Sequence, residues 1–148
     1  MEKHNDFSAM LDAMTFAGGQ PHFYLLNVGE THYPYALPQE TESEWPKLHG
    51  VHGIFKHLDD HLGQDYRDQK EEPFFDQAKM AELRQRQVTA VSYLDGLFER
   101  LYDLVPANTY ITVTSDHGEL FGEDGYFGHG PVMHEKVFEV PFLEGKIK

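Results

Sequence analysis

Cysteine is absent from the 148 residues, and basic residues are scarce. Without cysteine the chain has no disulfide framework, no thiolate zinc site and no cysteine nucleophile. Its 12 lysines and arginines stand against 25 aspartates and glutamates, which gives a formal net charge of −13. This balance disfavours nucleic acid and anionic membranes as partners, because both need a positive patch to meet phosphate. An anionic substrate is still compatible with this negative charge, since a bound divalent cation can invert the local electrostatic field around a site.

Long apolar runs are missing as well. No stretch approaches the roughly 18 apolar residues of a membrane span, and the polar segment 1–7 is not followed by the apolar region of a signal peptide. We therefore expect a soluble chain with no membrane segment, and its compartment stays open. A hydrophobic content of 40% argues against disorder. The length suits a single domain spanning residues 1–148.

Hydrophobic periodicity predicts an α/β fold. Residues 76–105 carry apolar side chains at helical spacing, and 7–16, within an N-terminal helical segment 1–21, suits a short helix. The apolar runs at 22–28 and 110–114 favour buried strands, and 137–143 favours a third strand with Pro141 at an edge position. Strand, helix and strand in this order predict a βαβ crossover, and hence a parallel sheet with functional loops at the strand C-terminal ends.

Residues 38–75 form the least regular part, which we interpret as a long surface excursion with one short helix at 54–62. It holds four of the ten histidines. His57 and His61 are four apart, a spacing at which a helix would place both on one face and allow chelation. A solvated polar helix is the alternative interpretation. The four histidines are His49, His52, His57 and His61.

Asp116 and His117 directly follow the 110–114 strand. Where the chain turns at a strand end, both side chains can converge on one ion. A carboxylate oxygen with an imidazole suits Zn²⁺ or Mn²⁺ better than Ca²⁺ or Mg²⁺. An aspartate that caps a helix, followed by an unrelated loop histidine, remains the alternative.

Several segments, in order and at matching spacing, closely resemble the sulfatase/alkaline-phosphatase superfamily. Together they span most of the chain, from residue 22 to residue 145. The segments are Thr31-His32-Tyr33-Pro34-Tyr35, Val91-Ser92-Tyr93-Leu94-Asp95, Asn108-Thr109, Thr112 to Gly125 with its Ser115-Asp116-His117-Gly118-Glu119 core, Gly128-His129-Gly130, and Val140-Pro141-Phe142.

The resemblance implies a partial doubly wound, mostly parallel sheet of the alkaline-phosphatase-like fold, and hydrolysis or transfer of sulfate or phosphate esters. By residue-wise match, Asp116 and His117 would be metal ligands, while His32 and His129 would face the ester. His117 in place of an asparagine, together with the Gly-His-Gly segment around His129, favours phosphoryl over sulfuryl chemistry. Loop interpretations of His32 and His129 stay open, and His134 is expected to face solvent, with a ligand role as the alternative. Glu30 and Glu119 are candidates for outer hydrogen-bond partners.

The resemblance covers only the C-terminal half of the family's pattern. Nothing before His22 resembles the segment that carries the nucleophile and the first acidic ligands, and Ser8 and Thr15 lack its context. We therefore expect a half-site that is inactive alone and needs an N-terminal half to act on an ester. Because a half sheet exposes a strand edge, we also expect self-association or a partner subunit. The alternative is a non-catalytic metal-binding or interaction domain derived from this fold.

Overall fold

The computed structural model describes residues 6–16, 19–46, 55–56, 77–130 and 132–148. The chain divides into two compact units. The first comprises Met1–Pro46, Gln85–Thr112 and Glu144–Lys148, and the second comprises Lys47–Arg84 and Val113–Leu143. No helix in the described part of the chain has both the length and the apolar character needed to cross a bilayer.

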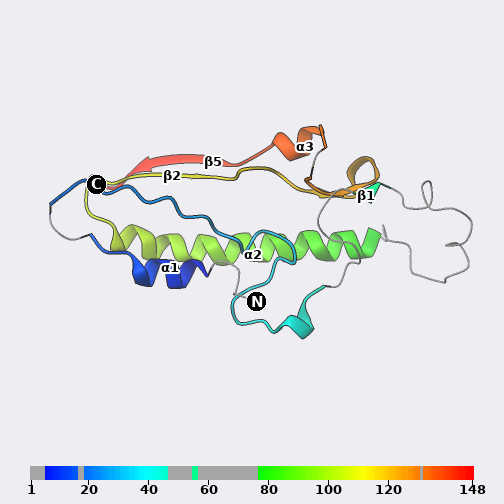
Figure 1. Ribbon diagram of the computed structural model, residues 1–148, viewed down its shortest axis with the longest axis horizontal. Coiled ribbons are helices and arrows are strands. Elements are labelled where there is room, and N and C mark those ends of the chain that lie inside the picture. The colour runs from blue at the N-terminus through cyan, green and yellow to red at the C-terminus, as the bar shows by residue number, and fades with distance from the viewer. Residues whose placement is uncertain (1–5, 17–18, 47–54, 57–76, 131) are drawn as a thin grey trace, which may run out of the picture. The chain divides into compact units, whose positions relative to one another are not determined.

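Two helices dominate the first unit (Figure 1). α1 spans Phe7–Ala13 and begins at an N-cap aspartate, Asp6, whose carboxylate accepts a hydrogen bond of 3.1 Å from the Ala9 amide. This contact satisfies one of the amides that a helix start leaves without a partner. α2 spans Gln77–Leu104 and confirms the helix predicted over 76–105. It ends just before Val105-Pro106, because proline disfavours helical backbone in the residue that precedes it.

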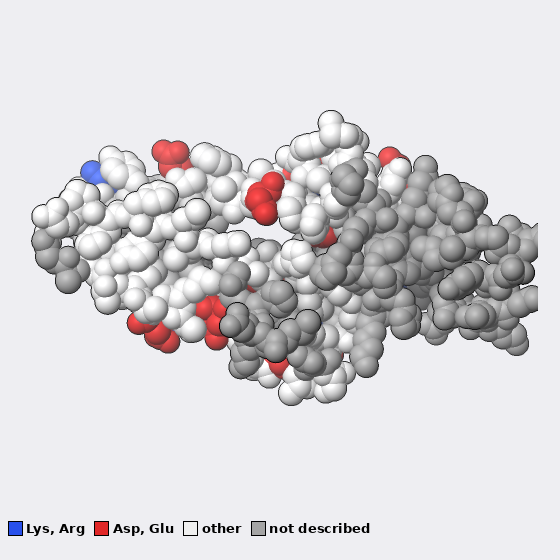
Figure 2. Space-filling view, in the orientation of Figure 1, with Lys and Arg blue, Asp and Glu red and all other residues white. Residues whose placement is uncertain are grey.

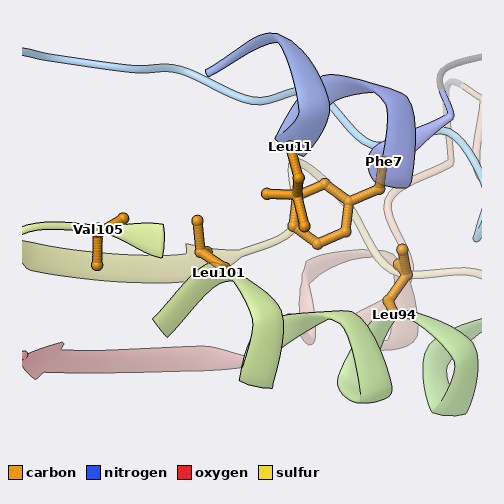
Figure 3. Packing of buried hydrophobic residues seen from close by; sticks show 5 residues of the cluster. All are labelled: Phe7, Leu11, Leu94, Leu101 and Val105. Atoms are coloured by element: carbon orange, nitrogen blue, oxygen red, sulfur yellow. The ribbon is translucent and has the colours of Figure 1, made fainter. Parts of the chain in front are cut away.

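The core of the first unit lies between these helices (Figure 3). Phe7 and Leu11 from α1 pack with Leu94 and Leu101 from α2 and with Val105. Each is at most 8% exposed, so each stabilises the unit by about 1.5–3 kcal/mol of apolar burial. The apolar spacing that predicted α2 therefore also selects the face that packs.

A two-stranded ladder joins β2 (Tyr110–Thr114) to β5 (Phe142–Lys146). The Asn108 amide donates to the Ile147 carbonyl and the Ile147 amide donates to the Thr109 carbonyl, each at 2.9 Å, where the ladder reaches the chain's end. This reciprocal pattern belongs to antiparallel strands, and Figure 1 shows β5 running back beside β2. β2 matches its predicted bounds, but its side chains alternate between exposed and half-buried positions rather than being buried throughout.

A three-stranded antiparallel sheet organises the second unit, in the order β1 (Phe55–Lys56), β4 (Tyr126–Gly128) and β3 (Leu120–Phe121). Phe127 of β4 pairs with Phe121 of β3, and its side chain is 2% exposed. A 3-10 turn, η4 (Glu123–Gly125), connects β3 to β4. The helix α3 (Glu135–Phe138) follows and buries Val137.

The mostly parallel sheet predicted from the sequence is not confirmed. Residues 22–28 form no strand: Leu26 and Val28 pack on the core of the first unit, while Phe23 and Leu25 are 89% and 85% exposed. The alternation is that of an extended chain, but a strand also needs a hydrogen-bonded neighbour, which local pattern does not supply. The third predicted strand, 137–143, is instead the end of α3 followed by β5.

The N-terminal helix is also shorter than its predicted range 7–16, ending at Ala13. In the predicted excursion, residues 38–46 contain a 3-10 turn, η1 (Glu42–Glu44), and most of the remainder lies outside the described residues. The first part of this segment is tied down by an ion pair between Arg86 of α2 and Glu40.

Charge is spread rather than gathered on the face that Figure 2 shows. The carboxylates of the described residues appear there as separate groups among uncharged atoms. The net charge of −13 therefore does not by itself mark a site, and the chemistry has to be sought in particular side chains.

Candidate metal-binding site

The loop that follows β2 is held by close backbone packing. The Ser115 hydroxyl donates to the His117 carbonyl at 2.7 Å, and the Gly118 amide donates to the Val137 carbonyl of α3 at 2.8 Å. A Cβ on Gly118 would overlap the carbonyl of Lys136, so this position admits only glycine. α3 thus supports the residues on both sides of Gly118.

His117 is oriented by its own loop. Its Nδ1 lies 2.8 Å from the Gly118 carbonyl, which can only accept, so Nδ1 carries the proton and Nε2 holds the lone pair of the neutral ring. The Asp116 Oδ1 lies 3.6 Å from that Nε2. Asp116 itself is 87% exposed. The predicted pair therefore converges, with an unprotonated nitrogen next to a carboxylate oxygen.

Glu119 and His129 are brought together by the register of the small sheet. Leu120 pairs with Gly128, so Glu119 and His129 flank the same end of the β3–β4 ladder. The His129 Nδ1 lies 3.1 Å from the Glu119 Oε2, and the Glu119 side chain is only 7% exposed. A carboxylate accepts from an imidazole N–H in this geometry, which fixes the orientation of the ring.

The rings of His117 and His129 stack, with centroids 3.6 Å apart and an angle of 21° between the planes. As a result His117, Glu119 and His129 can each offer a ligand atom, all within 4.8 Å of one another. Two imidazoles and a carboxylate form a donor set that fits Zn²⁺ or Mn²⁺. The sequence singled out Glu119 only as an outer partner; the spacing of the β3–β4 hairpin is the signal that places it opposite His129.

His134 was predicted to face solvent, and the structure corrects this. Its side chain is only 14% exposed. Its Nδ1 accepts a hydrogen bond of 3.1 Å from the Lys136 amide, capping α3, and its Nε2 lies 3.4 Å from the Asp124 Oδ2. Both ring nitrogens are thus engaged in holding the loop, so His134 acts as a cap.

His32 belongs to the first unit, whereas Asp116, His117 and His129 belong to the second. It is exposed on a tight turn in which its amide donates to the Gly29 carbonyl at 3.0 Å. Its Nδ1 lies 2.9 Å from the Tyr33 carbonyl, so Nε2 holds the lone pair of the neutral ring.

The other histidines of the excursion, His49, His52, His57 and His61, lie outside the described residues. The chelating pair proposed for His57 and His61 therefore stays a prediction.

Comparison with known proteins gives one match. A family model described as Sulfatase matches residues 5–144, which is nearly the whole chain. Neither the curated proteins nor the solved structures compared with the chain gave a match.

Proposed function

Since the chain belongs to the sulfatase family, a metal-dependent family that acts on sulfate esters, we propose that it forms the C-terminal, metal-binding half of an ester hydrolase or transferase of that type. The grouping of His117, Glu119 and His129, with the Asp116 carboxylate 3.6 Å from His117, supports this proposal. Nucleophile and first acidic ligands would come from another polypeptide segment. The donor chemistry accommodates sulfate and phosphate esters alike.

In this proposal Asp116 and His117 hold the metal. His117 offers Nε2 because its Nδ1 is engaged with the Gly118 carbonyl, and Asp116 Oδ1 is the nearest carboxylate oxygen to that nitrogen. Zn²⁺ or Mn²⁺ fits the nitrogen and oxygen donors. A bound divalent cation polarises an ester oxygen and lowers the pKa of a coordinated nucleophile.

His129 and His32 would face the ester. Glu119 engages Nδ1 of His129 at 3.1 Å. In His32 the Tyr33 carbonyl engages Nδ1 at 2.9 Å. These contacts orient both rings, as a general acid–base group requires.

The group of His117, Glu119 and His129 is a second candidate for the ligand set, because their ligand atoms already lie within 4.8 Å of one another. Calorimetry with Zn²⁺ and Mn²⁺ separates the two candidates. Asp116→Asn should weaken binding strongly, whereas Glu119→Gln should weaken it only modestly, as loss of an outer partner does. The matched control is Asp124→Asn, which removes an equally exposed carboxylate that contacts His134.

The opposite order, with Glu119→Gln and His129→Gln abolishing binding and Asp116→Asn silent, would transfer the site to the three-residue group. If all of these variants and His117→Ala bind Zn²⁺ and Mn²⁺ as wild type does, the metal site does not lie in this loop. The histidines of the excursion would then be the first alternative. A chain that binds metal but supports no chemistry with any complementing segment would fit the non-catalytic metal-binding domain instead.

We further propose that this chain alone turns over esters negligibly. Nothing before His22 resembles the family's nucleophile segment, so the route that splits the displacement into two easier steps would need a complementing segment. A bound metal would by itself supply only an activated water. Aryl phosphate, aryl sulfate and phosphodiester substrates, each with Zn²⁺ or Mn²⁺, provide the assay. Adding a polypeptide with the family's nucleophile segment should restore turnover that His32→Ala abolishes; robust turnover by the chain alone would contradict the half-site.

Exposed apolar residues support the proposal that the chain associates with itself or with a partner. In the first unit, Phe23, Leu25 and Tyr110 are 89%, 85% and 72% exposed. Such side chains are typical of surfaces that a partner covers. Light scattering over a concentration series tests this, and a monomer at the highest concentration would contradict self-association.

A further inference from the structure

Glu30 is the one charged residue among those buried in the described part of the chain. It is 3% exposed, and its Oε1 accepts a hydrogen bond of 2.8 Å from the Phe7 amide, across 23 residues of sequence. Its Oε2 is buried without a hydrogen-bond partner among the described residues. Burying a carboxylic group this incompletely paired costs free energy, so packing alone does not account for a glutamate here.

Glu30 lies within the turn that carries His32, since the His32 amide donates to the Gly29 carbonyl at 3.0 Å. Within that turn the Tyr35 amide donates to the His32 carbonyl at 2.7 Å. Two buried residues, Glu30 (3% exposed) and Tyr35 (1% exposed), flank His32, which is itself exposed. The turn is therefore anchored at both ends, and the histidine projects between the anchors.

Two further contacts tie the turn to its surroundings. Gln87 of α2 donates to the Thr31 carbonyl at 3.3 Å, and the Tyr33 hydroxyl donates to the Pro46 carbonyl at 2.6 Å. Glu30 itself accepts a hydrogen bond from the amide of Phe7, which is the first residue of α1 and a member of the core. Glu30 thus couples the turn to the core through a directional contact.

We propose that Glu30 is a positioning residue for His32. It fixes the position of the turn relative to the start of α1, and so fixes the position of the His32 imidazole. Phe7 is held by its ring, which packs edge-on against Phe98 at 5.8 Å between centroids. A hydrogen bond from this fixed amide defines the position of Glu30, and His32 follows two residues later. An apolar residue of equal volume would fill the same space but would not fix the position of the turn relative to α1.

The value of this positioning for catalysis rests on the proposed role of His32 in ester chemistry. A group that faces a reacting ester must be held near its productive position, because small displacements reduce the rate strongly. The physical coupling of Glu30 to His32 does not depend on that role and can be measured without metal or substrate.

The experiment compares Glu30→Met, Glu30→Gln and wild type by NMR. Methionine keeps the volume but accepts no comparable hydrogen bond, and glutamine keeps an acceptor oxygen. In Glu30→Met we expect the Phe7 amide to exchange about tenfold faster, as loss of a hydrogen bond to a buried carboxyl predicts. The imidazole nitrogen shifts of His32 should move toward values averaged over tautomers, and Glu30→Gln should restore both signatures.

Asp12→Asn is the matched control, because Asp12 pairs with Arg100 and so fastens α1 to α2 without touching the turn. It should leave His32 unchanged. Glu30→Ala is the second variant if methionine does not fold. Unchanged His32 signals in a folded Glu30→Met or Glu30→Ala protein, or an equal change in Asp12→Asn, would overturn the proposal.

A separate arm titrates inorganic phosphate into the Zn²⁺-treated wild type. If phosphate shifts His117 and His129 but leaves His32 untouched, the ester-facing role of His32 fails. The coupling of Glu30 to His32 would still stand on the variant spectra, so the two failures are distinguishable.

Discussion

Gly118→Ala should weaken the second unit without any change in charge or in ligand identity. Gly118 does not have a positive φ, so alanine is compatible with its backbone conformation. The obstacle is space: the added Cβ would overlap the Lys136 carbonyl and lie 2.8 Å from the Glu139 carbonyl. Both obstacles are backbone atoms, which cannot rotate away as a flexible side chain does.

The expected loss follows from two contributions. Forcing one extra carbon into a packed site costs about 1–3 kcal/mol. The shift also strains the hydrogen bond from the Gly118 amide to the Val137 carbonyl, a contact that contributes about 1 kcal/mol. A total near 2–4 kcal/mol lowers the melting temperature by roughly 6–12 °C in a chain of this size.

Gly96→Ala provides the matched control. Gly96 lies within α2, and a Cβ there would meet nothing within 4 Å. Alanine at this position should raise the free energy of unfolding by about 0.5–1 kcal/mol, because glycine is a poor helix former. Thermal unfolding followed by circular dichroism measures both variants. A Gly118→Ala protein as stable as wild type, with unchanged Zn²⁺ affinity, would refute the idea that α3 holds the ligand loop in place.

Three other changes test the fold. Burial raises the pKa of Glu30 above its unfolded value, so its stabilising contribution is present at low pH and is lost as pH rises through the folded pKa; relative to Glu30→Gln, wild type should lose stability to urea as pH rises above 4.5. Leu101→Ala should cost about 2–5 kcal/mol in denaturant unfolding because Leu101 is 6% exposed, whereas Val91→Ala, at 53% exposure, should cost far less. His134→Ala should cost about 1 kcal/mol and speed exchange of the Lys136 amide, because α3 loses its cap.

Each of these has a clear contrary outcome. A stability difference between wild type and Glu30→Gln that is independent of pH would mean that Glu30 titrates as it does in the unfolded chain. Equal losses of unfolding free energy in Leu101→Ala and Val91→Ala would show that the core does not lie at the contact between α1 and α2. An unchanged Lys136 amide in His134→Ala would assign the capping to another group.

Local pattern was sufficient to predict α2 and β2, although the residues that they pack against or pair with lie far away in the sequence. The apolar spacing of α2 defined both its bounds and its buried face, since Leu94 and Leu101 lie one above the other on the same side of the helix. The β-branched run Tyr110–Thr114 likewise predicted β2. Pattern failed at 22–28, where the side chains alternate as in a strand but the described structure forms no strand.

The sequence by itself determined the family, and it predicted the Asp116-His117 pair as metal ligands, because adjacent residues in a specific motif need no distant contact to be recognised. Only the tertiary structure decided which side chains join them. Pairing of Leu120 with Gly128 places Glu119 beside His129, and burial of Glu30 against Phe7 ties the His32 turn to α1. Strand register and long-range burial arise from contacts between residues far apart along the chain, and a single sequence carries no direct record of those contacts.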